Sequence, residues 1–358
     1  MKILFVWTGV TSYMADCWRA LAAEPGVELK VIVEQVASGR EFKADRVLAG
    51  LDYRLVVQHP NANTIEQSNN RTIEQTNGWL PDILFAVGWH SKVVRAFVTR
   101  ADWRNVPKVC CYDLPWDGSF RRIAARWVLG GFLRHYAAAY VPGVACERYA
   151  KWLRFPKIYK GLFSIDAEKF GGKATVGGTK PGRRDFLYVG RFAPEKRLDV
   201  LIRAFARYRQ LGGTWRLDLY GAGELPDLSE QSGLLTPAVR AALGVHGFIQ
   251  PDAVPGVYAA HGCFVLASDF DPWPLVVLQA CANGMPVVVS DRCTNHYELV
   301  RENGILFPHG DVEAMAAAML RVECEGLVGE AGRQLAEPYD KAEWTRRTLG
   351  ICRELVKK

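Results

Sequence analysis

Short apolar strand patterns alternate with helical patterns along this 358-residue chain, and that alternation restricts the possible folds more than any other feature. Five segments of the first half have strand patterns: 2–7, 27–33, 53–57, 82–87 and 108–112. Between the first two, Ser12–Ala23 has the apolar spacing of a helix that begins at a serine cap. Strands that alternate with helices form parallel sheets, because each helix returns the chain to the edge where the next strand begins. We therefore expect an α/β fold.

The same alternation starts again after a stretch rich in Gly and Lys, residues 171–184. Four more segments have strand patterns: 185–189, 215–220, 263–267 and 286–290. Helical patterns cover 199–211, 272–283 and the last segment. A length of 358 residues also suggests two domains. We therefore predict two doubly wound Rossmann-like domains, at residues 1–165 and 185–337. Residues 166–184 would form the linker between them, and residues 338–358 a terminal helix.

Composition argues against several other classes of protein. Hydrophobic residues make up 49% and charged residues 23% of the chain, as in ordinary globular proteins. No window of 18 uninterrupted apolar residues occurs, so no membrane-spanning helix is expected, and the apolar start at 1–7 is too short for a signal peptide. Nine cysteines without a CxxC pair favour reduced thiols over zinc sites or disulfides. We therefore expect a cytoplasmic protein.

The excess positive charge lies in the first half of the chain. Residues 1–163 hold 22 Lys and Arg against 14 Asp and Glu, whereas residues 164–358 hold 23 against 24. This asymmetry suggests an anionic partner, although the basic residues form no recognisable nucleic-acid module. Ser119–Arg134 has Phe120 and Trp127 on one helical face and arginines off that face, which indicates peripheral contact with an anionic membrane. The alternative is an ordinary core helix with a solvated side.

A basic loop follows the strand predicted at 185–189. Gly190 and Arg191 come directly after that strand, and Lys196 precedes the next helix pattern. Two cations at the carboxyl end of a strand, close to the N–H groups of a helix start, can bind an anion such as a diphosphate. The other interpretation is a loop with two solvated basic side chains.

A second region, residues 268–286, reads as a loop and a helix. Asp271 is expected to cap a helix that has Pro272 at its first position and ends at Gly284. At about 1.5 Å per residue, Asp271 and Gln279 would lie about 12 Å apart, comparable to the distance from sugar to ribose in a nucleotide-sugar. The other interpretation is a capped core helix with an incidental glutamine.

Together, these two regions resemble the retaining glycosyltransferases of family 4, which have the GT-B fold. The family has G-R-x-x-x-x-K, then E-x7-E and a helix that ends in A-x-G-x-P-V. This chain has GRFAPEK at 190–196, Asp271 and Gln279 at the two Glu positions, and ANGMPVV at 282–288. The resemblance is strong over the second half and weak over the first. It implies two domains that face a cleft, with the C-terminal helix returning to the first domain.

The resemblance also implies a role for each matching residue. Arg191 and Lys196 would bind the donor diphosphate and replace the charge of a metal, so neither a metal nor a cofactor is expected. Asp271 would contact the transferred sugar and Gln279 the ribose. The other donor-site positions by this resemblance are Gly190, Gly221, Gly223, Phe248, Ile249, Trp273, Pro274 and Leu275.

The chain departs from the family pattern at three of these positions. Asp271 and Gln279 replace the signature glutamates, and Pro274 replaces a usual glycine and lacks an N–H group. Two alternatives therefore stay open, a nucleotide-sugar-binding protein without catalysis and a nucleotide-sugar epimerase on the same scaffold. A dehydrogenase is not expected, because no GxGxxG follows the first strand.

Three residues after predicted strands of the first half are further candidates. By the resemblance, His90 would lie near the anomeric carbon, unless it is a surface-loop histidine. Asp113 would orient or deprotonate the acceptor, unless it only caps a turn. Gly9 would let the backbone approach the acceptor closely. Asp271, Asp113 and His90 are thus the predicted catalytic residues.

The expected activity is transfer of a hexosyl group from a nucleotide-sugar to an acceptor hydroxyl with retention of anomeric configuration. The acceptor would be a carbohydrate or a lipid-linked molecule of bacterial surface polysaccharide or glycolipid synthesis. One feature stands outside this hypothesis. The octad that begins TIEQSN at 64–69 recurs as TIEQTN at 72–77, and it reads as a polar surface loop or a partner-binding loop.

Overall fold

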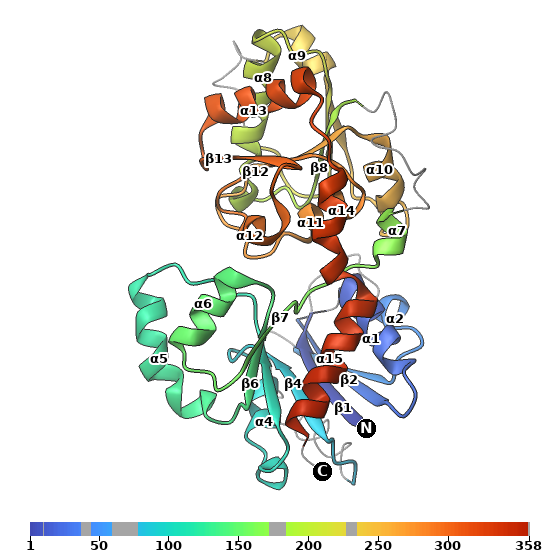
Figure 1. Ribbon diagram of the computed structural model, residues 1–358, viewed down its shortest axis with the longest axis vertical. Coiled ribbons are helices and arrows are strands. Elements are labelled where there is room, and N and C mark those ends of the chain that lie inside the picture. The colour runs from blue at the N-terminus through green and yellow to red at the C-terminus, as the bar shows by residue number, and fades with distance from the viewer. Residues whose placement is uncertain (10, 37–43, 59–77, 172–183, 227–234, 357–358) are drawn as a thin grey trace. The chain divides into compact units, whose positions relative to one another are not determined.

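The computed structural model describes residues 1–9, 11–36, 44–58, 78–171, 184–226 and 235–356. The duplicated octad and most of the predicted linker lie outside these residues. The chain divides into two compact units (Figure 1). Unit 1 comprises Met1–Ile165 with Tyr339–Lys358, and unit 2 comprises Asp166–Pro338. Each unit is described by itself below.

Unit 1 is built on a seven-stranded parallel sheet with the order β3-β2-β1-β4-β5-β6-β7. Its strands are β1 (Lys2–Thr8), β2 (Glu28–Val36), β3 (Tyr53–Gln58), β4 (Ile83–Val87), β5 (Lys108–Cys111), β6 (Ala138–Val141) and β7 (Ile158–Lys160). Ile3, Leu4, Phe5 and Val6 in the inner strand β1 are all fully buried. Such a continuous apolar run is required where helices cover both faces of a sheet.

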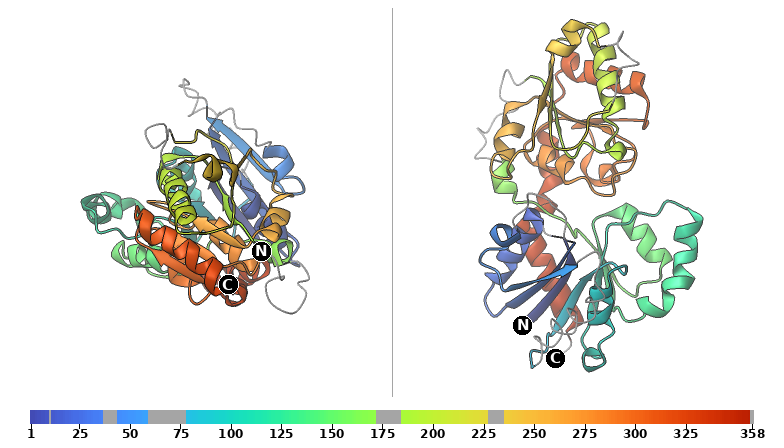
Figure 2. Two further views of the ribbon diagram at one scale, coloured as in Figure 1. Left: turned by 90° about the horizontal axis from the view of Figure 1, so that it is seen from above. Right: turned by 180° about the vertical axis from the view of Figure 1, so that it is seen from behind.

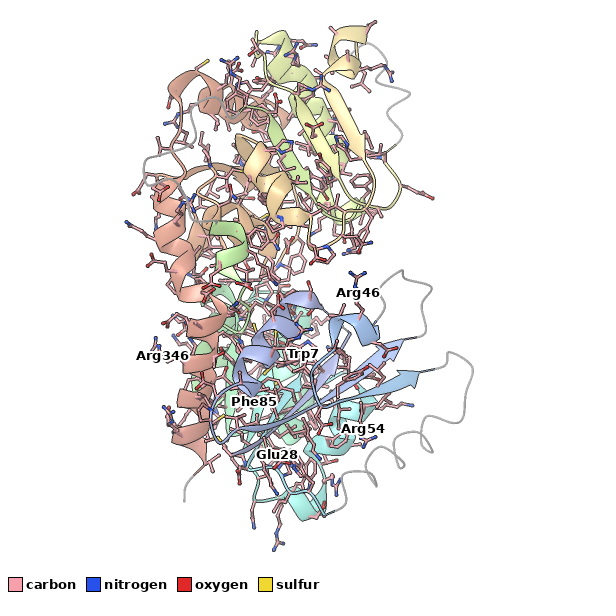
Figure 3. The ribbon with its side chains drawn as sticks, turned by 90° about the vertical axis from the view of Figure 1, so that its right-hand side faces the viewer. Trp7, Glu28, Arg46, Arg54, Phe85 and Arg346 are labelled. Carbon is pink, nitrogen blue, oxygen red and sulfur yellow. The ribbon has the colours of Figure 1, made fainter. Side chains whose placement is uncertain are left out.

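Among the described residues, the α-helices that accompany this sheet are α1 (Ser12–Ala22), α2 (Ala44–Val47), α4 (Lys92–Val98), α5 (Phe120–Leu133), α6 (Val144–Trp152) and α15 (Lys341–Leu355). Although α15 is last in the sequence, it lies beside α1 (Figure 1). Phe5 stacks on Phe85 with ring centroids 4.7 Å apart, and the Trp344 ring of α15 lies 6.0 Å from Phe5. Figure 3 shows Phe85 and Trp7 inside unit 1, while Arg346 of α15 points outward. The core of unit 1 thus includes the end of the chain.

Unit 2 has a six-stranded parallel sheet with the order β10-β9-β8-β11-β12-β13. Its strands are β8 (Phe186–Val189), β9 (Leu217–Tyr220), β10 (Leu243–His246), β11 (Cys263–Leu266), β12 (Val287–Ser290) and β13 (Gly304–Phe307). Helices lie on both sides of this sheet (Figure 2). They are α7 (Ala167–Gly171), α8 (Leu198–Gln210), α9 (Pro237–Ala241), α10 (Val254–Ala260), α11 (Leu275–Ala282), α12 (His296–Leu299), α13 (Val312–Glu325) and α14 (Glu330–Ala336).

The prediction of two doubly wound α/β sheets is confirmed. All nine predicted strands form, with ends that differ by at most three residues. Sequence reasoning missed the short strands β6, β7, β10 and β13. Of these, β7, β10 and β13 are edge strands, where one side of the strand lacks a neighbour and the apolar pattern is weakest.

Candidate functional site

The loop after β8 carries the basic residues of the first motif. Gly190 leaves the strand and donates its N–H to the Tyr220 carbonyl over 3.0 Å. A single turn of 3-10 helix, Pro194–Lys196, then leads to Arg197, which adopts the left-handed conformation at φ 50° before α8 begins. The side chains of Arg191 and Lys196 are thus held at the carboxyl end of β8, the edge of a parallel sheet where ligands usually bind.

The glycines after β9 let a second loop pack against this one. A Cβ atom at Gly221 would lie 1.8 Å from the Gly190 carbonyl oxygen, and one at Gly223 would lie 2.2 Å from the Phe192 carbonyl oxygen. Phe192 also donates its backbone N–H to the Ala222 carbonyl over 2.8 Å. The structure therefore gives these two predicted donor-site glycines a packing reason: backbone fills the space that a side chain would need.

Lys196 and Asp271, one from each sequence motif, form an ion pair between Nζ and Oδ2. Their side chains are only 16% and 11% exposed. Burial raises the pKa of the Asp271 carboxyl, and the charges of Lys196 and then Arg191 act against this rise. Asp271 is therefore a buried acid whose ionised form depends on the neighbouring cations.

Arg191 makes a weaker contact. Its Nη2 atom lies 2.7 Å from Glu195 Oε1, and its side chain is 66% exposed. An exposed ion pair of this kind contributes little free energy, so an anion can take the place of Glu195 at small cost. Arg191 and Lys196 together offer two positive charges beside Asp271.

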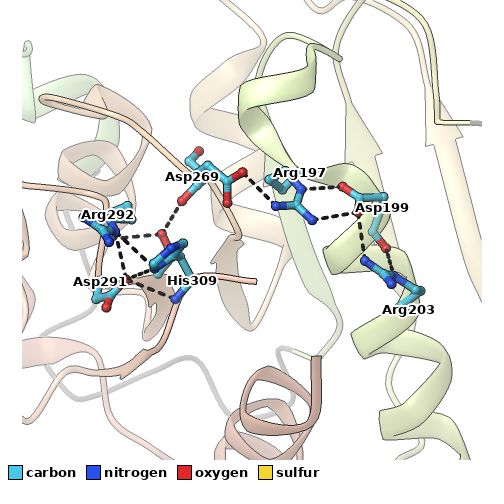
Figure 4. A network of polar contacts seen from close by, with 9 residues as sticks. Arg197, Asp199, Arg203, Asp269, Asp291, Arg292 and His309 are labelled. Carbon is cyan, nitrogen blue, oxygen red and sulfur yellow. Dashed lines mark hydrogen bonds and ion pairs between the residues drawn. The ribbon is translucent and has the colours of Figure 1, made fainter. Parts of the chain in front are cut away.

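Sequence reasoning missed the network that supports this loop (Figure 4). The Arg197 guanidinium contacts Asp269 over 2.7 Å and Asp199 over 2.9 Å and 3.0 Å. Arg203 contacts the same Asp199 carboxylate over 2.9 Å. A left-handed residue other than glycine costs roughly 1–2 kcal/mol, and these bonds offset that cost. The signal in the sequence was the pair of acids at positions 199 and 269, close to the two motifs.

The predicted start of the second-motif helix is wrong. Helix α11 begins at Leu275, and its N-cap is Pro274 with φ −65° and ψ 102°. A proline disfavours helical backbone in the residue before it, so Trp273 cannot belong to the helix. Asp271 instead pairs with Cys293 in an isolated bridge, and the separation predicted from one continuous helix does not apply. The predicted end holds, because Gly284 follows α11 with φ +70°.

Gln279 lies half-buried in α11 and faces Tyr258 of α10. The Tyr258 hydroxyl donates to Gln279 Oε1 over 3.1 Å and lies at the same distance from the Val276 carbonyl. With its oxygen engaged in this way, Gln279 has its amide N–H groups left to donate. Among the remaining donor candidates, Trp273 and Pro274 are buried, Ile249 and Leu275 are half-buried, and Phe248 is 45% exposed.

A histidine pair on one carboxylate was also missed. His246 Nε2 lies 2.9 Å from Asp218 Oδ1, and His261 Nε2 lies 3.2 Å from Oδ2 of the same carboxylate. The His246 ring also stacks on Tyr220 with centroids 4.2 Å apart. This cluster fixes the end of β10 from which residues 247–249 continue. It gave no sequence signal, because β9, β10 and the end of α10 contribute one residue each.

The three candidates of unit 1 follow β1, β4 and β5, which are neighbours in the sheet. Because the sheet is parallel, Gly9, His90 and Asp113 all lie at the edge formed by the carboxyl ends of its strands. Gly9 has φ +79°, a conformation that favours glycine, and donates its N–H to the Glu34 carbonyl over 2.8 Å. His90 is exposed, and Asp113 is half-buried. Nothing lies within 4 Å of a Cβ built on Gly9, so that space is open on the protein side.

Glu34 is a further acid at this edge that sequence reasoning missed. It ends the apolar run of β2 and is only 5% exposed. Its Oε2 accepts a hydrogen bond from the Ser91 hydroxyl, which in turn caps α4 by accepting from the Val94 N–H over 3.1 Å. Burial raises the pKa of Glu34, and the Ser91 bond acts against this rise. The carboxylate reaches from β2 to the residue after His90.

Within the residues that the structure describes, no group of three or more His, Cys, Asp or Glu side chains could hold a metal ion. Over the same residues, none of the helices has the length and apolarity needed to cross a membrane.

Comparison with known families gives a match in unit 2. The family profile described as "Glycosyl transferases group 1" matches residues 183–323. Sequence relatives include the sulfoquinovosyl transferase SQD2 of Arabidopsis thaliana, 28% identical over 49% of this chain and 34% of that protein. The amylovoran biosynthesis glycosyltransferase AmsK of Erwinia amylovora is 29% identical over 46% of this chain and 42% of its own length. The exopolysaccharide phosphotransferase SCO2592 of Streptomyces coelicolor is 33% identical over 37% of this chain and 14% of its own length.

These alignments therefore span less than half the length of each of these relatives. Solved structures match along almost the whole chain. HepE of Anabaena in complex with UDP has a TM-score of 0.74 at 16% identity and covers 99% of this chain and 100% of its own. The galactosyltransferase WaaB has a TM-score of 0.71 at 15% identity and covers 99% of both chains. The resemblance seen in the motifs is confirmed at the level of glycosyl transferases group 1, whose profile matches residues 183–323, and the chain has the GT-B fold.

Proposed function

We propose that this protein is a retaining glycosyltransferase that moves a hexosyl group from a nucleotide-sugar to an acceptor hydroxyl. The observation that carries this proposal is the pairing of Lys196 with Asp271, beside Arg191, at the carboxyl end of β8 in the family-matched domain. Its support also includes HepE, which has been solved with UDP-glucose.

The cations would bind the donor diphosphate. The positive charges of Lys196 and Arg191 would interact both with Asp271 and with the phosphate oxygens. They would stabilise the negative charge that develops on the diphosphate as it leaves. We propose that they do so without a metal ion. The bond from C1 of the sugar to the phosphate oxygen breaks, the acceptor oxygen bonds to C1 on the same face, and the acceptor proton passes to the departing phosphate oxygen.

Asp271 would bind the sugar. Its carboxylate can accept hydrogen bonds from sugar hydroxyls, and its burial excludes competing water. Gln279 would donate from its amide to a ribose oxygen, since Tyr258 engages its carbonyl. The exposed ring of Phe248 would contact the base, with Ile249, and residues 273–275 would line the sugar side.

Unit 1 would bind the acceptor. Gly9, His90 and Asp113 share one edge of its sheet, and Glu34 lies buried at the same edge. We propose a carbohydrate or lipid-linked acceptor in surface polysaccharide or glycolipid synthesis, used in the cytoplasm at or near the inner membrane face. The amylovoran enzyme AmsK supports a polysaccharide role.

One alternative has an observation in its favour. The signature glutamates are replaced, and Lys196 is already neutralised by Asp271, so the site could bind a nucleotide-sugar without turning it over. This alternative predicts nucleotide binding and no glycoside product from a broad acceptor panel.

The test begins with thermal unfolding in the presence of UDP, GDP, ADP or dTDP. A ligand at about 100 times its dissociation constant should add roughly 2.7 kcal/mol of stability. We expect one nucleotide to stabilise the wild type and to have no effect on Lys196→Ala. Mass spectrometry of acceptor mixtures with the matching nucleotide-sugar then separates transfer from binding alone. If no nucleotide stabilises the protein, the donor site is wrong.

A further inference from the structure

Helix α5 of unit 1 has apolar side chains on two opposite faces. Its inner face is covered, because Phe132 and Leu133 are buried and Ala125 and Leu129 pack against the core. A soluble helix normally has polar residues opposite such a face. The outer face of α5 therefore needs a separate explanation.

Three large apolar residues form this outer face. Phe120, Trp127 and Val128 are 84%, 67% and 79% exposed, the largest values among big hydrophobic side chains in the described part of the chain. Spacings of seven and eight residues place all three on one side of the helix, along about 12 Å of its length at about 1.5 Å per residue. Figure 1 shows α5 at the outside of unit 1, next to α6.

The charged residues within α5 all have one sign. Helix α5 contains Arg121, Arg122 and Arg126 and no acidic residue. The Arg126 guanidinium lies 5.7 Å from the ring of Trp127 and 5.4 Å from that of Trp152, so it stays at the border of the apolar stripe. Arg122 is the exception among the three, since Asp117 lies 3.7 Å away and offsets its charge.

We propose that the outer face of α5 binds the surface of a lipid bilayer that contains anionic phospholipids. Phe120, Trp127 and Val128 would enter the boundary between headgroups and acyl chains, where aromatic and branched side chains lose contact with water. Arg121 and Arg126 would contact the phosphates. A soluble protein partner fits less well, because an apolar stripe on a helix whose charged residues are all arginines matches a uniformly negative surface. This inference does not depend on catalysis, so it can hold even if the chain only binds nucleotide-sugars.

The experiment is flotation of the full chain with phosphatidylcholine vesicles, with and without phosphatidylglycerol. We expect the wild type to float only with the anionic vesicles. Phe120→Ser with Val128→Ser should abolish flotation, and Arg121→Gln with Arg126→Gln should weaken binding about fivefold per arginine. The matched controls are Val328→Ser, an exposed apolar residue of unit 2, and Arg346→Gln, an exposed arginine of unit 1, and both should float like the wild type.

Three results would overturn the inference. One is flotation of the two double variants equal to that of the wild type. Another is equal binding to both kinds of vesicle, which would remove the role of the arginines. The last is a dimer in sedimentation that Phe120→Ser with Val128→Ser dissolves, without any vesicle binding, because the face would then join two copies of the chain. Circular dichroism identifies any variant that has lost its fold. If the variant with Phe120→Ser and Val128→Ser does not fold, the arginine variant still tests the inference.

Discussion

At the scale of single residues, each unit has one almost fully buried carboxyl group among its candidate residues. Asp271 in unit 2 is paired with Lys196, and Glu34 in unit 1 accepts a hydrogen bond from Ser91. Burial raises the pKa of both groups, which means that their ionised forms are held at a cost. Each therefore links pH to stability in a way that a substitution can reveal.

We expect Lys196→Ala to destabilise the protein by about 3–5 kcal/mol near neutral pH, because it leaves Asp271 buried and unpaired. The loss should shrink as pH falls through the raised pKa of Asp271, since the protonated acid needs no partner. Urea unfolding of the wild type and the variant at several pH values measures this loss in the free energy of unfolding. The double variant Lys196→Met with Asp271→Asn is the control and should recover most of the stability. A loss that is the same at every pH would contradict this account.

Glu34→Gln tests the acid of unit 1. In the wild type, the folded state holds its Glu34 proton to higher pH than the unfolded state does. Stability from this group is therefore full below the ordinary carboxyl pKa and is lost as pH rises through the raised value. Glutamine can still accept from Ser91 but does not titrate, so the variant should lose less stability over that interval. Thermal melts of both proteins from acidic to neutral pH measure the difference, and parallel curves would show that Glu34 is not buried as described.

At the scale of elements, the loops after β8 and β9 are held together by backbone contacts. The turn at Gly221 lies against the carbonyl of Gly190, so the loop that carries Arg191 and Lys196 takes its position from the strand next to it. The neighbouring Arg197 network holds the same loop from the α8 side. The geometry of the cations thus depends on two neighbouring elements besides their own.

Gly221→Ala should displace this loop. The new methyl group would lie 1.8 Å from the Gly190 carbonyl oxygen, and relieving such a contact costs typically about 1–3 kcal/mol. We expect a lower melting temperature and weaker nucleotide stabilisation. Gly247→Ala is the matched control, because nothing lies within 4 Å of its Cβ position. If both variants behave alike, the tight contact between the two loops is not what positions the cations.

At the scale of the whole molecule, the chain crosses from unit 1 to unit 2 and returns. Helix α15 lies in unit 1 although it follows all of unit 2 in the sequence. Trp344 in that helix is fully buried and donates its Nε1–H to the Leu162 carbonyl over 2.7 Å. The last helix is therefore part of the core of unit 1 rather than an appendage.

Trp344→Ala should destabilise unit 1 by about 3–5 kcal/mol, as expected for loss of a buried aromatic residue. The Leu162 carbonyl would also lose its partner. Hydrogen exchange followed by mass spectrometry should show faster exchange in β1, β4 and α1, with little change in unit 2. Arg346→Ala, an exposed residue in the same helix, serves as the control. Faster exchange spread evenly over both units would be inconsistent with a role confined to unit 1.

The amino-acid sequence by itself determined the class of fold, the place of two basic residues proposed to bind an anion, and the resemblance of the second half to glycosyl transferases group 1. Short apolar runs predict the buried strands, a period of 3.6 residues predicts the helices, and Arg191 and Lys196 lie between a predicted strand and the next helix pattern. These signals are local. Local signals did not predict the edge strands or the first residue of α11. The helix starts at Leu275 because Pro274 precedes it.

Only the tertiary structure decided which side chains meet. Lys196 reaches Asp271 because β8 lies next to β11, and Glu34 reaches Ser91 because β2 and β4 flank β1. It also decided that α5 has one apolar face covered and the other exposed, which a helical pattern shows only as two apolar stripes. The physical reason is common to all three cases. Periodicity is set by neighbours along the chain, whereas contacts and burial are set by the order of strands in the sheet and by the layers that cover it.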